Sequence, residues 1–446
     1  MTALRPLDGQ EIDHDVTLEP GAYLLPHGLR VTRPGVRLLG NGATLIGAGE
    51  GAGVSITGQD GVSVEGLNLI GYHHGLAARD LAGLFVSGLR VRGTTEVAAN
   101  TTFLDIWRPA GEAYGAAVLL DGARQSRLEG NDLQHNQNGL LSYACRELRV
   151  TRNEASYNSG WGFHLNDTTG SLFEGNHADG CCRFEPRPGG PHYGHVGADA
   201  AGFLIVNGSS RNVFRRNSAR LGGDGFFLAG LSPDLTARGC DQNLFEDNDA
   251  SLSPNIGFEA TFSSGNVFRN NVASRGNYGF WLGFSRHTLV EGNRAHQNRM
   301  AGVAAGNAAE LDVRGNDFQA GLHGVLLWTH PAREFLTLFP DLETLHDVRI
   351  TRNTFLRNHT ALRVVADRDH GLRPLELPPV TATIPRRVTA TGNTIQDNRI
   401  GLDLSRLLEG RFEGNTLRGN VEANVRLDDC EDVIVRDNLG AAGGYL

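Results

Sequence analysis

Lysine is absent from this chain of 446 residues, so all 41 basic residues are arginines. The absence excludes Schiff-base chemistry and a lysine general base, and any cationic contact with a substrate must come from arginine or histidine. No basic patch accompanies the formal net charge of −9, which argues against a nucleic-acid partner. Long apolar runs are also missing, since no stretch reaches the roughly 18 residues of a membrane-spanning helix.

The first residues, MTALRPLDGQEIDHDV, contain no apolar signal core, and we therefore expect a cytoplasmic location unless a signal was trimmed. Cysteine is scarce, and its odd number and irregular spacing exclude a disulfide framework. The adjacent Cys181 and Cys182 have no CxxC or HxxxH partner, so we interpret them as buried or loop thiols. We expect no metal and no resident cofactor. The five cysteines are Cys145, Cys181, Cys182, Cys240 and Cys430.

Glycine, by contrast, is abundant, with 59 residues, and an apolar-x-x-Asn signature recurs along the chain. Seven of the eleven intervals between its asparagines are 22 or 23 residues, and the other four are one such unit plus an insertion. Asparagines stacked at tight turns can hydrogen-bond between successive coils, which predicts an asparagine ladder. The repeat asparagines are Asn131, Asn153, Asn176, Asn217, Asn248, Asn271, Asn293, Asn316, Asn353, Asn393, Asn415 and Asn438.

This repeat predicts an all-β fold, a right-handed parallel β-helix whose coils stack about 4.8 Å apart. A leucine-rich repeat would need an L-x-x-L-x-L core, and a propeller would need roughly twice the period. We expect one domain over residues 1–446, with an N-terminal cap and the first coils in 1–60. Loop insertions are expected at 177–202, 228–242, 328–348 and 364–388.

The repeat resembles the pectin-lyase-like β-helix superfamily, and in particular the NosD-like β-helix repeat proteins with carbohydrate-binding or sugar-hydrolase homology. The resemblance covers most of the chain through the pattern x-G-N-x-x-x-x-N, with GADAAGF, GGDGFF, GFEATFSSGN and NYGFWLG in the central coils. It implies the fold, and by analogy at the level of the fold it implies a poly- or oligosaccharide as the substrate. It does not identify the chemistry.

Strand residues at a fixed offset from the turn glycine should align along the solenoid, because side chains alternate between the two faces of a strand. One residue after the glycine the sequence is uniformly apolar, so this column must point inward. The next position must point outward, and it carries Phe227, Glu259 and Trp281 on consecutive coils. Exposed rings beside a carboxylate resemble a sugar-binding groove. The alternative is that an inserted loop covers this face and packs on the rings.

Two further carboxylates precede turn glycines, Asp199 before Gly202 and Asp224 before Gly225. Strand spacing would place the carboxyls of Asp224 and Glu259 roughly 5–9 Å apart, and those of Asp199 and Glu259 roughly 10 Å apart. Glycosidases need two carboxyls about 5–5.5 Å apart for retention or about 6.5–9.5 Å apart for inversion. We therefore predict Asp199, Asp224 and Glu259 as catalytic residues. Three unrelated surface or turn carboxylates are the alternative.

The longest interval between repeat asparagines contains the insertion CCRFEPRPGGPHYGHVGADA, which is rich in arginine, histidine and tyrosine. Loops that leave a rigid scaffold commonly carry function, and this one suggests a polar wall beside Asp199. The segment LDIWRP is a further stretch that could close the groove. The predicted substrate-binding residues are His164, Arg183, His192, Tyr193, His195, Phe227, Tyr278, Trp281, Asp105 and Trp107.

Three functions compete. In a glycoside hydrolase, Asp224 or Asp199 would be the general acid and Glu259 the base or nucleophile, although the motifs of polygalacturonase-type hydrolases are missing. In a polysaccharide lyase or epimerase acting on a uronate, the base would be His195, His164, Arg183 or Tyr193, and Asp199 with Asp224 could hold Ca²⁺. The third function is a non-catalytic carbohydrate-binding or structural β-helix. A homo-oligomer is compatible with each.

Overall fold

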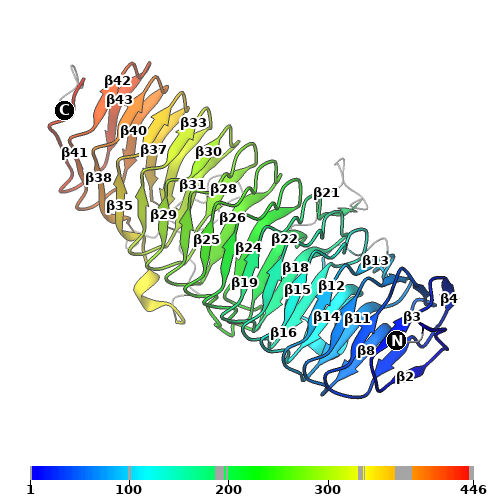
Figure 1. The fold of residues 1–446 in the computed structure, drawn as a ribbon. Coiled ribbons are helices and arrows are strands. Elements are labelled where there is room, and N and C mark those ends of the chain that lie inside the picture. Colours follow the sequence, from blue (N-terminus) through cyan, green and yellow to red (C-terminus); the bar gives the residue numbers. More distant parts are fainter. Residues whose placement is uncertain are drawn as a thin grey trace. The chain divides into compact units, whose positions relative to one another are not determined.

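The computed structural model describes residues 3–98, 101, 103–185, 195–196, 199–329, 335, 337–366 and 384–440. The chain divides into two compact units, residues 1–227 and 228–446, and each unit is described by itself. In both units short strands alternate with tight turns, and Figure 1 shows the strands of successive coils lying side by side. Parallel strands joined in this way form a β-helix, and such crossovers are right-handed in nearly all proteins.

Every coil of the first unit contributes a strand to a first sheet and a second sheet, and some coils add a third. The first sheet contains β2 (Gln10–Ile12), β5 (Leu29–Val31), β8 (Ala52–Thr57), β11 (His74–Arg79), β14 (Ala116–Asp121), β16 (Leu140–Tyr143), β18 (Trp161–Asn166), β22 (Ala201–Val206) and the start of β24 (Asp224–Ala229). The second sheet contains β1 (Ala3–Leu4), β3 (Val16–Leu18), β6 (Arg37–Leu39), β9 (Ser63–Glu65), β12 (Phe85–Ser87), β15 (Arg127–Glu129), β17 (Arg149–Thr151), β19 (Leu172–Glu174) and β23 (Val213–Arg215). The third contains β4 (Ala22–Leu24), β7 (Thr44–Ile46), β10 (Asn68–Ile70) and β13 (Arg90–Arg92).

The second unit repeats this architecture. Its first sheet contains β26 (Ile256–Thr261), β28 (Tyr278–Trp281), β31 (Ala301–Gly306), β34 (His323–Trp328), β37 (Thr360–Val365), β40 (Ile400–Ser405) and β43 (Ala423–Asp428). The second sheet contains β25 (Leu244–Glu246), β27 (Val267–Arg269), β29 (Leu289–Glu291), β32 (Asp312–Arg314), β35 (His346–Thr351), β38 (Arg386–Thr391), β41 (Arg411–Glu413) and β44 (Ile434–Arg436). The third contains β30 (Arg294–His296), β33 (Asp317–Gln319), β36 (Thr354–Leu356), β39 (Thr394–Gln396) and β42 (Thr416–Arg418).

The inward column of the first sheet is confirmed. All eight predicted side chains are fully buried, and neighbouring rings stack, as Phe163 does on Phe203 with ring centroids 4.7 Å apart. The glycine before a column residue leaves no room for a side chain in coils such as that of Phe163, where a Cβ on Gly162 would lie 2.5 Å from the Cβ of Ala178. The column residues are Leu140, Phe163, Phe203 and Phe226 in the first unit, and Phe258, Phe280, Val303 and Val325 in the second.

The asparagine ladder is confirmed as well. In the first unit the amide nitrogen of Asn153 donates to the carbonyl oxygen of Leu128 at 3.1 Å and to Oδ1 of Asn176 at 3.0 Å. In the second unit Asn271 donates in the same way to Phe245 at 3.0 Å and to Asn293 at 3.0 Å. Each of these asparagines therefore gives a hydrogen bond to a buried carbonyl oxygen and another to the asparagine of the next coil. Because both bonds need the asparagines to be aligned, they fix the register of successive coils.

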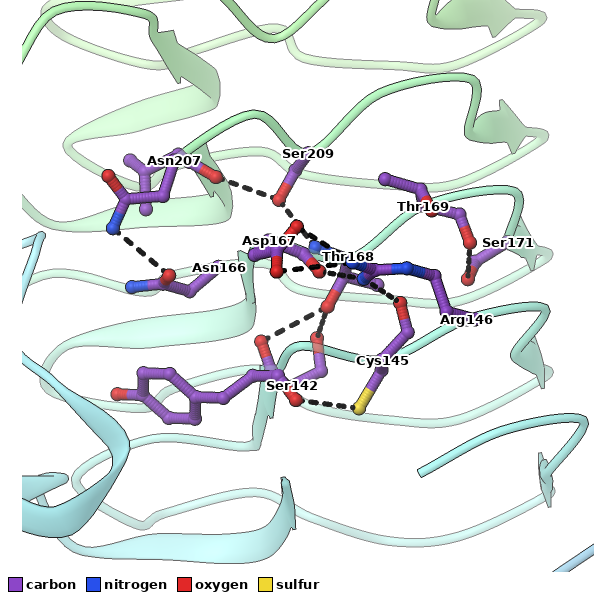
Figure 2. A network of polar contacts seen from close by, with 12 residues as sticks. Ser142, Cys145, Arg146, Asn166, Asp167, Thr168, Thr169, Ser171, Asn207 and Ser209 are labelled. Atoms are coloured by element: carbon purple, nitrogen blue, oxygen red, sulfur yellow. Dashed lines mark hydrogen bonds and ion pairs between the residues drawn. The ribbon is translucent and has the colours of Figure 1, made fainter. Parts of the chain in front are cut away.

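A second ladder of polar side chains, drawn in Figure 2, runs along the end of the first sheet in the first unit. The Thr168 hydroxyl donates to Oγ of Ser142 at 3.2 Å, and Ser209 Oγ accepts from the Thr168 amide at 3.0 Å. Cys145 belongs to this network, since its thiol donates to the carbonyl oxygen of Tyr143 at 3.2 Å. Burial raises the pKa of the Cys145 thiol to about 12, so it stays protonated and acts as a small core side chain.

Segments that leave the coil geometry occur at several turns. The expected insertion at 177–202 contains the antiparallel hairpin β20 (Phe184–Glu185) and β21 (His195–Val196). The one at 328–348 contains the short 3₁₀ helix η2 (Pro340–Leu342), and most of the one at 364–388 lies outside the described residues. Another long connection, between β13 and β14, contains the 3₁₀ helix η1 (Ala110–Glu112) and was not among the expected insertions.

Candidate functional site

The candidate site lies on the outer face of the first sheet, and the two units expose this face differently. In the first unit a strap, residues 103–114, lies over it. Leu104 and Ile106 of the strap are buried, and so are the outward-facing Leu141 and Leu204, all at 1% exposure or less. The segment that contains LDIWRP therefore covers this part of the face in the first unit.

Asp199 holds the strap to the sheet. Its side chain is fully buried, and Oδ2 accepts a hydrogen bond from the Leu104 amide at 2.7 Å and one from Arg183 Nη2 at 2.6 Å. The Arg183 side chain is only 11% exposed, so the ion pair is shielded from water. The Asp199 carbonyl oxygen also accepts from Trp161 Nε1 at 2.6 Å. Asp199 and Arg183 therefore act together as an anchor between the sheet and the strap.

His164, which we predicted to bind substrate, is buried beneath the strap. Its ring stacks on Trp161 with centroids 4.7 Å apart and lies edge-on to Tyr143 at 5.3 Å. Nε2 lies 3.3 Å from the carbonyl oxygen of Ile106. Burial lowers the pKa of His164 to about 3, so the ring is neutral at ordinary pH. Because only a donor can bond that carbonyl, Nε2 carries the proton.

Asp224 opens β24 and is fully buried, with its amide donating to the Ala200 carbonyl oxygen at 2.9 Å. Phe227, three residues later on the same strand, is partly buried. Asp199 and Asp224 both belong to the first unit, whereas Glu259 belongs to the second. The separations expected between Glu259 and the two aspartates stay predictions.

The remaining predicted residues of the first unit divide between the strap and the insertion. Asp105 is exposed, and its Oδ1 accepts from the Trp107 amide at 3.0 Å, so Asp105 shapes the strap itself. His192 and Tyr193 lie outside the described residues, and only the main chain of His195 is described, paired with Glu185 in the hairpin.

In the second unit the same face carries a carboxylate beside aromatic rings. Glu259 of β26 is partly exposed and pairs in register with the partly exposed Trp281 of β28. Trp281 lies edge-on to Tyr278, with ring centroids 4.8 Å apart, and 5.2 Å from the tilted ring of Trp328. Tyr278 and Trp328 are almost fully buried and belong to the hydrophobic cluster against which Trp281 packs. We call Glu259, Tyr278, Trp281 and Trp328 the aromatic–carboxylate patch.

Sequence reasoning missed the residues that surround the predicted ones. The missed Trp161 stands one position before the turn glycine, as the predicted Tyr278 does, and the missed Tyr143 and Trp328 stand four positions after it. These rings lie on the outward side, since Trp161 stacks on His164, Tyr143 lies edge-on to His164, and Trp328 lies against Trp281. Alternation continued from the outward column predicts the direction of Tyr143 and Trp328. It does not predict that of Trp161, because alternation would place Trp161 on the same face as the inward Phe163.

A charged groove of about 600 Å³ was also not expected from the sequence. It lies along the second sheet of the second unit, where Arg387 donates to Asp347 from Nε at 2.7 Å and from Nη2 at 2.8 Å. The Arg387 guanidinium and His346 hold the pKa of the Asp347 carboxyl well below its usual range. The other charged residues that line the groove are Glu310, Arg349, Glu409, Arg411 and Asp432.

The described residues do not assemble a metal centre. No group of three or more His, Cys, Asp or Glu side chains among them is arranged to hold a metal ion. Burial raises the pKa of the Cys181 thiol to about 12 and also raises that of Cys182, so neither is poised as a thiolate ligand. Within the same described residues, no helix has the length and apolar character needed to cross a membrane.

These features define a β-helix protein with a partly strapped outer face, and comparisons with known proteins agree with that class. A family model described as "Right handed beta helix region" matches residues 87–241. A second, described as "Periplasmic copper-binding protein (NosD)", matches residues 195–371. Together with the sheet topology, these matches place the chain in the right-handed parallel β-helix superfamily. None of the curated proteins compared with the chain matches it.

Solved structures with a similar fold differ in function. The A-module of mannuronan C-5 epimerase AlgE6 from Azotobacter vinelandii is 16% identical, with 85% of this chain and 90% of that chain covered and a TM-score of 0.46. The catalytic domain of a GH87 α-1,3-glucanase is 11% identical, with coverages of 95% and 64% and a TM-score of 0.45. PfbA, a surface adhesin of Streptococcus pneumoniae, is 9% identical, with coverages of 90% and 84% and a TM-score of 0.37. These likenesses concern the fold alone.

Proposed function

We propose that this protein binds a poly- or oligosaccharide on the aromatic–carboxylate patch and hydrolyses a glycosidic bond there, with Glu259 as the base or nucleophile. The observation that supports this proposal is the register of the partly exposed Glu259 beside the partly exposed Trp281 on the first sheet. Aromatic rings that expose one face suit the apolar face of a pyranose, and a partly exposed carboxylate beside them can reach a sugar carbon or a water.

Hydrolysis requires a second carboxyl, and Asp224 is the proposed general acid. Asp224 is fully buried at the start of β24, where burial favours the protonated form that a general acid needs. Asp199 is a weaker candidate, because its Oδ2 is already occupied by Arg183 and the Leu104 amide beneath the strap. A lyase or epimerase would instead need a neutral-pH base, and the described His164 is buried with its Nε2 committed to the strap.

The experiment is a panel of neutral and uronate-containing glycans, incubated with the wild-type protein and with Glu259→Gln, Asp224→Asn and Trp281→Ala. New reducing ends that disappear in Glu259→Gln and Asp224→Asn by about 10²- to 10⁴-fold would support hydrolysis. Trp281→Ala should weaken glycan binding. Asp312→Asn is the matched control, because Asp312 is a partly buried carboxylate on the second sheet of the same unit.

Three outcomes would contradict hydrolysis. Ultraviolet absorbance of an unsaturated uronate would indicate a lyase, and conversion of one uronate into its C5 epimer without new ends would indicate an epimerase. Glycan binding that needs Trp281 but survives Glu259→Gln, with no turnover of any glycan, would indicate a binding module. Loss of activity in Asp312→Asn as well would mean that the fold, and not the site, had been disturbed.

A further inference from the structure

The strap of the first unit is held to the first sheet largely by histidine rings. His164 Nε2 lies 3.3 Å from the Ile106 carbonyl oxygen, and His73 Nε2 lies 3.0 Å from that of Ala113. His74, at the start of β11, hydrogen-bonds the main chain of Tyr114. The strap therefore meets a histidine ring near its middle and two more at its end. The other anchor is Asp199, through the Leu104 amide at 2.7 Å.

Two of these rings are built to be neutral. Nδ1 of His164 and Nε2 of His74 are buried, and neither has a hydrogen-bond partner among the described residues. In the neutral tautomer one nitrogen donates to the strap, and the other carries a lone pair that needs no acceptor. A second proton would place a charged N–H where no acceptor receives it. Burial accordingly lowers the pKa of each ring to about 3.

The groups that face the two rings do not offset a positive charge. Around His164 stand Tyr143 from β16, Trp161 from its own strand and the Ile106 main chain from the strap. His74 lies edge-on to His73 at 4.4 Å, and the charges of His73 and Arg79 lower its pKa further. The Asp199 carboxylate at the Leu104 end of the strap is itself paired with Arg183.

We propose that the strap is a histidine-latched lid, which opens on acidification and uncovers the Trp161–His164 surface of the first sheet. The inference is independent of the function proposed for the second unit. In the closed state each ring can accept a second proton only as a buried, charged N–H without an acceptor, whereas in the open state the ring is solvated and titrates normally. Closure is therefore fully stabilised above about pH 6.5 and loses that stability as the pH falls toward 3.

Linkage sets the size of the effect. Below pH 6.5 each latching histidine raises the ratio of open to closed molecules about tenfold per pH unit. Between pH 7.5 and pH 5 one histidine would raise that ratio by about thirtyfold, and two by about a thousandfold. A latch made of His164 and His74 together should therefore show close to the square of the single-histidine effect.

Hydrogen exchange of the full chain, followed by mass spectrometry from pH 7.5 to pH 4.5 and corrected for intrinsic exchange, measures this ratio at strap amides such as Leu104. His164→Gln and His74→Gln keep a side-chain N–H that can reach the strap but remove the titration. Each single variant should halve the slope of the logarithm of the open-to-closed ratio against pH, and the double variant should abolish that slope. His177→Gln is the control, because His177 is exposed and lies on the same unit.

Two results would overturn the lid. One is a strap whose corrected exchange does not change between pH 7.5 and pH 5, or changes equally in the wild type and the double variant. The other is simultaneous loss of protection at ladder amides such as Asn153, which would indicate acid unfolding of the whole unit. If His164→Gln does not fold, His74→Gln alone still decides, because its slope must fall to half of the wild-type slope.

Discussion

The outer face of the first sheet is the same structural element in the two units, yet some of its outward side chains meet different environments. In the first unit the outward Leu141, His164 and Leu204 are buried beneath the strap, and Asp199 is committed to an ion pair. In the second unit Glu259 and Trp281, at the same offset from the turn glycine, are partly exposed, whereas Ala304 and Leu326 on the following coils are buried. The coil therefore sets which way a side chain points, and the connecting segments decide whether it meets water, a strap or a ligand.

The largest contrast should appear between two carboxylates. Asp199→Asn leaves Arg183 buried without its counter-charge and weakens the bond to Leu104, so it should lower the free energy of unfolding by about 3–5 kcal/mol. Glu259→Gln changes a partly exposed group and should lower it by less than about 1 kcal/mol. Chemical denaturation of both variants measures the difference, and equal losses would mean that Glu259 is also a structural anchor.

The two faces of one strand provide the next comparison. Phe258 points inward and stacks on Phe280 with centroids 5.1 Å apart, so Phe258→Ala should cost about 3–5 kcal/mol of stability. Trp281 is partly exposed, so Trp281→Ala should lower the free energy of unfolding by less than about half of the loss in Phe258→Ala. The same variant should bind glycan more weakly. Thermal unfolding and calorimetric titration separate the two effects. A Trp281→Ala variant as unstable as Phe258→Ala would show that the ring is core and not platform.

The asparagine ladder should behave alike in the two units, in contrast to their outer faces. Asn153 and Asn271 make the same pair of amide hydrogen bonds, one to a carbonyl oxygen and one to the next asparagine. Replacing either by alanine should lower the free energy of unfolding by about 2–4 kcal/mol, because buried partners lose their bonds. Values for Asn153→Ala and Asn271→Ala that differ widely would show that the ladder is not an independent scaffold.

The smallest effect is expected from acid titration of a surface carboxylate in the second unit. The pKa of Asp347 is lowered by Arg387 and His346, so its contribution is present above the usual value near 3.8 and is lost as the pH falls below it. Asp347→Asn should therefore reduce stability slightly at pH 7 and not at all at very low pH. Because the pair is well exposed to solvent, high salt should diminish even this loss, which a denaturation series in salt can check.

Much of the fold could be predicted from the sequence, because a solenoid repeats one local pattern. The 22- or 23-residue spacing of Asn131, Asn153 and Asn176 predicted the ladder, and the apolar column around Phe163 predicted the core. Much less of the site was predictable. The role of Asp199 depends on Leu104, which lies 95 residues away in the sequence, and no local pattern encodes that contact.

The sequence by itself determined the coil, its register and the direction of Glu259, since each of these follows from spacing within one repeat. Only the tertiary structure decided which outward residues are accessible. The 103–114 segment buries His164 in the first unit, and the rings of Tyr278 and Trp328 support Trp281 in the second. The physical reason is that burial depends on every segment that packs over a residue, whereas the direction of a side chain depends only on its own strand.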